Sequence, residues 1–198
     1  MPHLFRDKPK WSTRMTADPG SLTRDTTSQQ IDILAVIDTE YIKLRYPHPS
    51  KQPELPIAVD HRAVRLLYTG ARGASIGNGP ADPVLTLYPG DTVSLRAVSL
   101  YENAEDAVLI YQVSHLFGQQ VFNPFSQDFL DVNAVQLNPE TRDGLPPLTQ
   151  PHTFVSIGAK ARESGIETLG ACFGLYTLER STQELLGYYW WDWFVTCS

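Results

Sequence analysis

The chain has 198 residues, of which 42% are hydrophobic and 19% are charged, and its formal net charge is −6. This is a globular composition, and the length suits one domain whose core needs no disulfide or metal to hold it. Residues 1–30 carry five basic and three acidic side chains, a balance of +2, so the remaining residues carry −8. Residues 31–198 are therefore acidic and lack the clustered Lys and Arg that bind phosphate backbones. We expect no nucleic-acid partner.

The sequence also indicates a compartment. No stretch approaches the roughly 20 apolar residues of a membrane span, and no apolar run near the start suits a secretory signal. The two cysteines, Cys172 and Cys197, match neither a disulfide framework nor a zinc pattern. We therefore expect a cytoplasmic protein with free thiols and no membrane partner.

Residues 1–29 are polar, are interrupted by Pro2, Pro9 and Pro19, and show no hydrophobic periodicity. Such a segment cannot bury enough apolar surface to order itself, so it predicts a disordered N-terminal extension. Residues 30–198 are then expected to form a single domain, and limited proteolysis should leave a core that begins near Gln30.

The rest of the chain predicts strands. Residues 31–37 are almost all apolar, and residues 46–57 carry four prolines, which predict a long extended loop. Further alternating or apolar runs, separated by turn sequences such as Asp143-Gly144, lie near 62–69, 84–88, 92–101, 107–117, 129–135, 153–157, 167–178 and 185–195. Short strands at this spacing predict an all-β fold, an antiparallel β-sandwich of either jelly-roll or immunoglobulin-like form. At most one or two short helices are expected, the best candidate being Ser156–Gly165.

Six aromatic residues occupy seven positions near the C-terminus. Because alternate residues of a strand face opposite sides, Tyr189, Trp191 and Trp193 share one face, while the other carries Tyr188, Trp190, Asp192 and Phe194. One set should enter the core, and the other should be covered by a loop, a second subunit or a ligand. The candidate binding or interface residues from this strand are Tyr189, Trp191, Asp192 and Trp193.

Two loop regions offer weaker candidates. Asp38, Glu40, Asp60 and His61 lie at the two ends of the proline-rich loop, where carboxylates could bind a hard cation, but their spacing matches no EF-hand or zinc pattern. The alternative is that they cap turns and form ion pairs, so we expect no metal and no cofactor. Arg72 lies between two small residues of a glycine-rich segment without the Lys of a P-loop, and it is a candidate for holding a carboxylate or supporting an interface.

Catalytic motifs are absent from the sequence. Gly-x-Ser-x-Gly and His-Glu-x-x-His occur nowhere, and the five histidines are isolated from one another. We therefore expect no catalytic residues and no enzymatic activity.

Several separate blocks, in order from about residue 30 to the end, resemble the AidA/PixA family of bacterial inclusion body proteins. The blocks are Gln30–Ile42, Tyr46–Ser50, Val59–His61, Thr69–Gly73, Asp106–Tyr111, Gln120–Asn123, Gln136–Pro139, Arg142–Pro146, Tyr176–Leu178 and Gly187–Asp192. The resemblance implies a bacterial protein whose relatives are linked to quorum-sensing control or accumulate as intracellular inclusions, and it implies no established activity. The chain departs from the family in its N-terminal extension and in having only two methionines, Met1 and Met15, which argues against sulfur storage.

Three functions remain open at this point. The leading hypothesis is a non-catalytic, self-associating β-sandwich that forms a homo-oligomer and is abundant in quorum-sensing or host-associated growth. The second is a binding module for a small molecule or carbohydrate, which would need a concave patch of aromatic and polar groups. The third is an enzyme of unrecognised type, which would need titratable groups with perturbed pKa values in a cleft.

Overall fold

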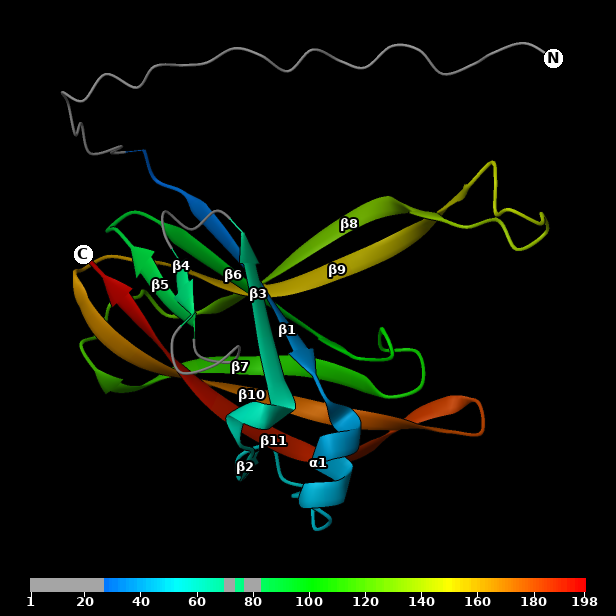
Figure 1. The fold of residues 1–198 in the computed structure, drawn as a ribbon, viewed down its shortest axis with the longest axis horizontal. Coiled ribbons are helices and arrows are strands. Elements are labelled where there is room, and N and C mark those ends of the chain that lie inside the picture. Colours follow the sequence, from blue (N-terminus) through cyan, green and yellow to red (C-terminus); the bar gives the residue numbers. More distant parts are fainter. Residues whose placement is uncertain (1–26, 70–73, 77–82) are drawn as a thin grey trace.

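The computed structural model describes residues 27–69, 74–76 and 83–198 of the chain, shown as a ribbon in Figure 1. Most of the predicted N-terminal extension, residues 1–26, lies outside the described residues, and so does Arg72.

Two β-sheets make up the described fold. One has the strand order β3-β1-β6-β9-β8 and consists of β1 (Gln30–Ile37), β3 (Val64–Thr69), β6 (Thr92–Ser99), β8 (Ser126–Gln136) and β9 (Leu148–Lys160). The other has the order β4-β5-β11-β10-β7, with β2 paired to β11, and consists of β2 (Ile57–Ala58), β4 (Ala74–Ile76), β5 (Pro83–Leu87), β7 (Ala107–Gly118), β10 (Gly165–Glu179) and β11 (Thr182–Cys197). The all-β prediction is confirmed. Most strand pairs are antiparallel, but β1–β6, β11–β2 and β11–β5 are parallel, so both sheets are mixed.

Helical structure in the described residues is limited to α1 (Thr39–Arg45) and the 3₁₀ turn η1 (His61–Ala63). The predicted helix at Ser156–Gly165 is wrong, because β9 continues to Lys160 and β10 begins at Gly165. Ile157 pairs with Leu95 of β6 and lies buried in the core. This burial outweighs the weak local helical pattern.

The core lies where the inward faces of the two sheets meet. In β1, Ile31, Ile33, Ala35 and Ile37 are all buried, while the residues between them are partly or fully exposed. The second sheet contributes alternate residues of β10 and β11, including Phe173 and the aromatic row of β11. The period-two pattern of each strand thus fixes which face is buried.

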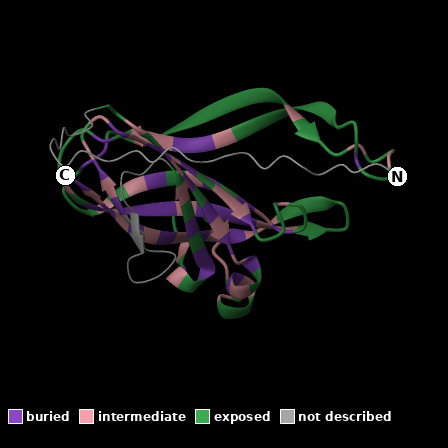
Figure 2. Cartoon of the chain, turned by 45° about the horizontal axis from the view of Figure 1, so that its top comes forward, coloured by how far each residue is buried: buried purple, intermediate pink, exposed green. Residues whose placement is uncertain are grey.

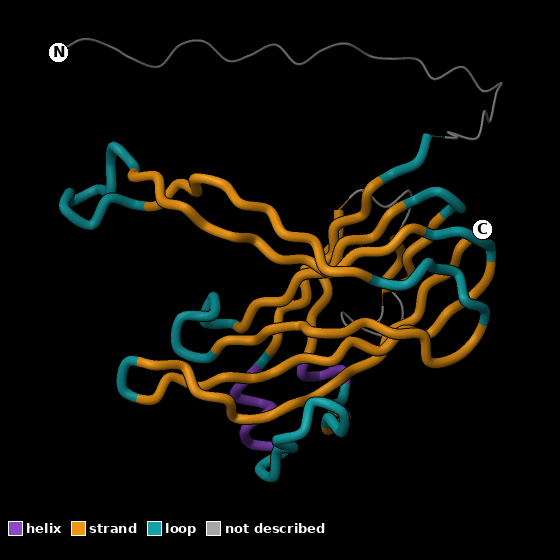
Figure 3. The backbone as a smooth tube through the Cα atoms, turned by 180° about the vertical axis from the view of Figure 1, so that it is seen from behind, coloured by secondary structure: helices purple, strands orange, loops and turns teal. Residues whose placement is uncertain are grey.

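β8 and β9 form a hairpin that extends beyond this core. The two strands pair along their full length, from Ser126↔Gly158 to Gln136↔Leu148, but β9 joins β6 only through Ile157–Lys160. The remainder of the hairpin, residues 126–156, projects away from β7, β10 and β11 in both Figure 1 and Figure 3. We call residues 126–156 the arm. Figure 2 shows that the arm is exposed over nearly all its length.

Candidate functional site

The structure assigns the two faces of the aromatic strand β11. Tyr189, Trp191 and Trp193 face the core and are at most 3% exposed. Trp191 stacks on Trp193 with ring centroids 5.9 Å apart, and Phe173 of β10 packs against both Tyr189 and Trp191. These three candidate interface residues therefore pack in the core. An interface on β11 would have to use its outward-facing residues instead.

The outward face of β11 is partly covered by the protein's own chain. Tyr188 makes an edge-to-face contact with Tyr111, whose hydroxyl donates to the Pro53 carbonyl at 2.7 Å. The proline-rich loop also bonds to the edge of β11, since the Tyr188 N–H donates to the Ser50 carbonyl. Asp192, the fourth candidate on this strand, lies 3.3 Å from His61 Nε2. This face is therefore less open than a free aromatic platform would be.

The loop acids act as caps and ion-pair partners. Asp38 caps α1 by accepting from the Tyr41 N–H at 2.9 Å, and Asp60 caps η1 by accepting from the Arg62 N–H at 2.8 Å. Glu40 pairs with Lys43 within α1. Among the described residues, no group of three His, Cys, Asp or Glu side chains is placed to hold a metal ion.

Asp60 is the centre of a hydrogen-bonded group between α1 and η1. Its Oδ2 accepts from the Tyr41 hydroxyl at 2.6 Å and from the Tyr46 hydroxyl at 3.3 Å. Partial burial opposes ionisation of Asp60, but the hydrogen bonds from Tyr41, Arg62 N–H and Tyr46 outweigh it and lower the pKa of the carboxyl. The carboxylate is thus fixed in place and charged at neutral pH.

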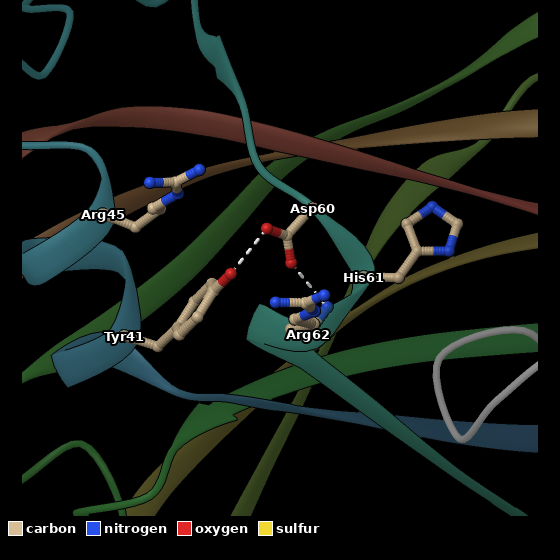
Figure 4. Close-up of a pocket in the computed structure, with 5 residues that line it drawn as sticks. All are labelled: Tyr41, Arg45, Asp60, His61 and Arg62. Atoms are coloured by element: carbon tan, nitrogen blue, oxygen red, sulfur yellow. Dashed lines mark hydrogen bonds between the residues drawn. The ribbon is translucent and has the colours of Figure 1, made fainter.

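An open concavity of about 690 Å³ surrounds this group, and Figure 4 shows its lining. Tyr41 and Arg45 come from α1, and Asp60, His61 and Arg62 come from the turn that leads into β3. Figure 4 shows the Tyr41 hydroxyl pointing at Asp60 and the His61 ring pointing away from it. The concavity therefore combines one fixed carboxylate with two guanidinium groups, which suits a polar ligand.

The arm is the other candidate site, and it is apolar. Opposite residues of β8 and β9 share a face, so the pairs Leu130↔Phe154, Val132↔His152, Ala134↔Gln150 and Gln136↔Leu148 form one face of the arm. These four pairs contain no Asp, Glu, Lys or Arg, and the same face continues toward the body of the protein with Asp128 opposite Ser156. Leu130 is 53% exposed and Phe154 41% exposed. An apolar face of this kind on a soluble protein marks a contact surface.

The opposite face of the arm is mixed. Phe129 and Val135 are exposed there, and the Thr153 hydroxyl donates to Asp131 Oδ1 at 2.6 Å. The arm was missed in the sequence analysis, although strands were predicted at 129–135 and 153–157. The signal that distinguishes it is the occurrence of apolar residues on both faces of β8, since a strand over one core would alternate.

The fold and these sites define a two-sheet β-sandwich protein with a projecting apolar hairpin. The family model for PixA, described as inclusion body protein, matches residues 29–197. The crystal structure of an inclusion body protein (PixA) from Burkholderia cenocepacia J2315 is similar to this chain, with 33% identity and a TM-score of 0.74 over 90% of this chain and 100% of that chain. A comparison with curated proteins found no match.

The chain therefore belongs to the PixA inclusion body protein family, and the family resemblance seen in the sequence is confirmed. α1 is far too short to cross a membrane, and no other α-helix occurs in the described residues. Cys172 and Cys197 are both free thiols.

Proposed function

We propose that this protein is a non-catalytic, self-associating member of its family, and that its copies contact one another through the arm. The observation that carries this proposal is the face of the arm that exposes Leu130, Val132, Leu148 and Phe154 to water. Burying such side chains gains about 25 cal/mol per Å² of apolar surface. No described residue covers this face, and a second copy is the occupant that we infer.

The stability of the arm supports the same proposal. A two-stranded hairpin without a packed face is marginal in water, yet β8 and β9 stay paired over eleven consecutive positions. Eleven paired residues cover about 35 Å by 10 Å. The two faces of the arm together therefore have an area on the order of 700 Å². A standard protein interface buries about 800 Å² on each partner. One face of the arm, about half of that area, thus supplies less than half of the surface that each partner of a standard dimer buries.

The test replaces the apolar pair with serine, as Leu130→Ser/Phe154→Ser. A matched control is Leu109→Ser/Phe117→Ser on β7, because Leu109 is 52% exposed and Leu130 is 53% exposed. We expect the arm variant to weaken the dimer by about a hundredfold or more, the size of a central interface contact, while circular dichroism stays unchanged. An equal effect in both variants, or in neither, would remove the arm from the proposal.

We also propose a setting for this self-association, which the family resemblance supports. We place the protein in the cytoplasm of a bacterium, at high abundance during quorum-sensing or host-associated growth; its two free thiols suit a reducing compartment. The test is immunoblotting of fractionated cells at low and high density. Equal, low amounts at all densities, or recovery outside the cytoplasm, would count against this setting.

A second candidate function is a binding module for a small molecule or carbohydrate, and the Asp60 concavity favours it. A sugar would meet a fixed carboxylate as acceptor, two guanidinium groups as donors and the ring of Tyr41. Titration with neutral and acidic sugars, followed by the unfolding midpoint, tests this role, because binding to the folded state raises the midpoint. A shift that Arg62→Ala abolishes would support a ligand module, and no shift with any sugar would argue against it.

A further inference from the structure

The free edge of the first sheet is β8, and it lacks several of the usual protections of an edge strand, since its charged residues are limited to Asp128 and Asp131. Edge strands in soluble proteins typically carry Lys, Pro or a β-bulge that blocks pairing with another chain. Ser126–Gln136 contains no Lys, Arg, Pro or Gly, and its register against β9 runs without a shift. The partner strand β9, by contrast, carries Pro151 in the arm. Of the two edges of the arm, that of β8 is therefore open to a further strand.

The sequence of β8 is also self-complementary about Val132. Between Asp128 and Gln136, each polar residue is matched by a polar residue and each apolar residue by an apolar one at the same distance from Val132, and the next pair, Gln127 and Leu137, ends the match. When two copies run antiparallel with Val132 opposite Val132, the facing pairs are Asp131–Asn133, Leu130–Ala134, Phe129–Val135 and Asp128–Gln136. Every carboxylate then faces an amide, which is a favourable cross-strand arrangement.

We propose that two copies pair antiparallel along β8, with the two-fold axis at Val132, so that two five-stranded sheets become one continuous ten-stranded sheet. This proposal rests on the self-association proposed above and locates the contact at the β8 edge. Of the two residues tested above, Leu130 then faces Ala134 of the other copy, whereas Phe154 on β9 lies outside the direct strand contact. The unpaired backbone groups of the β8 edge gain hydrogen-bond partners. The faces of the two arms that carry Leu130 and Val132 also become one surface, because facing residues of an antiparallel pair lie on the same side.

Neighbouring symmetric registers are less favourable. A two-fold axis at Asp131 places that carboxylate opposite its own copy, and like charges directly opposite destabilise a sheet. An axis at Asn133 places the polar Asp131 opposite Val135 and the polar Gln136 opposite Leu130. Only the register at Val132 keeps both the apolar and the polar matches.

Charge gives this register a recognisable signature. The two Asp131 side chains become diagonal neighbours across the interface, and the hydrogen bond from Thr153 offsets part of their repulsion. Added salt screens charges that are near the surface. The dimer should therefore become tighter with rising ionic strength, and Asp131→Asn should reduce this dependence.

The decisive test uses cysteine variants of the full chain and a short bismaleimide. Facing Cβ atoms of an antiparallel pair lie about 4.5–5.5 Å apart. Val132→Cys should thus give covalent dimers from most of the chain. Val135→Cys alone should give few, whereas a mixture of Val135→Cys and Phe129→Cys chains should give mixed dimers. Wild-type protein controls for the native Cys172 and Cys197 thiols.

The outcomes separate the two proposals. Covalent dimers at Val132 with mixed dimers at Phe129 and Val135 support pairing along β8 in this register. A dimer by sedimentation that gives no cross-link at Val132 overturns the register but leaves self-association standing. A monomer in sedimentation at all concentrations overturns both proposals.

Discussion

Leu130 of β8 and Phe154 of β9 lie directly opposite one another on one face of the arm, and among the described residues both remain exposed, Leu130 at 53% and Phe154 at 41%. In the body of the protein, opposite residues of comparable size, such as Phe173 and Tyr189, are buried between the sheets. The same cross-strand packing therefore serves the core in one place and an exposed arm in the other. This contrast is the basis of the proposed contact between copies.

The first prediction concerns the core face of β11. Trp191→Ala removes a buried ring that packs on Phe173 and Trp193, and it should lower the free energy of unfolding by about 3–5 kcal/mol. Trp190→Ala, on the half-buried outward face of the same strand, should lower the free energy of unfolding by clearly less. Urea denaturation followed by circular dichroism measures both. Equal losses would mean that both faces of β11 are core.

The second prediction concerns Glu167, a carboxylate that is 1% exposed at the start of β10. Its Oε2 accepts from the backbone N–H groups of Val121 and Phe122, and its Oε1 lies 2.9 Å from His115 Nδ1. Glu167→Ala leaves two buried N–H groups unpaired and should cost about 3 kcal/mol or more. Glu167→Gln keeps an acceptor oxygen for them and should cost about 1 kcal/mol. If the two variants lose the same stability, the negative charge rather than the acceptor matters.

The third prediction concerns pH and Asp60. Its pKa is lower in the folded state than its ordinary value of 3.8, so its ionised form stabilises the fold above that value. This contribution is lost as the pH falls through the lowered folded pKa. Asp60→Asn should therefore be less stable than wild type by about 1 kcal/mol at pH 7, and the difference should vanish in strong acid. Asp32→Asn, a half-buried aspartate of β1, serves as control; a pH-independent difference at Asp60 would contradict the linkage.

The fourth prediction concerns metal. Asp38 and Asp60 act as helix caps, and Glu40 is paired with Lys43. Treatment with EDTA should leave the thermal unfolding midpoint unchanged. A fall of several degrees that calcium restores would show that these carboxylates hold a cation.

The strand pattern of the body could be predicted from sequence because burial on one face imposes a period of two. β1, for example, was predicted as residues 31–37 and spans Gln30–Ile37. The helix α1 was missed although its N-cap, Asp38, is a preferred capping residue, because seven residues give too little periodicity to recognise. β2 was not predicted for the same reason. It has two residues, too few to show a period, and it forms only because it pairs with β11, which is distant in the sequence.

The sites were harder to predict. The alternation of β11 showed that Tyr189 and Trp190 face opposite sides, but only the packing of the opposite sheet decides which of them is buried. The concavity at Asp60 needs α1 and η1 to come together across the proline-rich loop, which no local pattern specifies. The exposure of the arm depends on where β9 leaves β6, at Ile157, and this too is a tertiary fact.

The central claim is that the protein associates with itself through the arm, and the molar mass in solution tests it most directly. Sedimentation equilibrium over a range of concentrations should give twice the 22.2 kDa of one chain for the wild type. The variant Leu130→Ser/Phe154→Ser should give 22.2 kDa over the same range, with its circular dichroism unchanged. A wild-type mass of one chain at every concentration, or a variant that remains dimeric, would contradict the account.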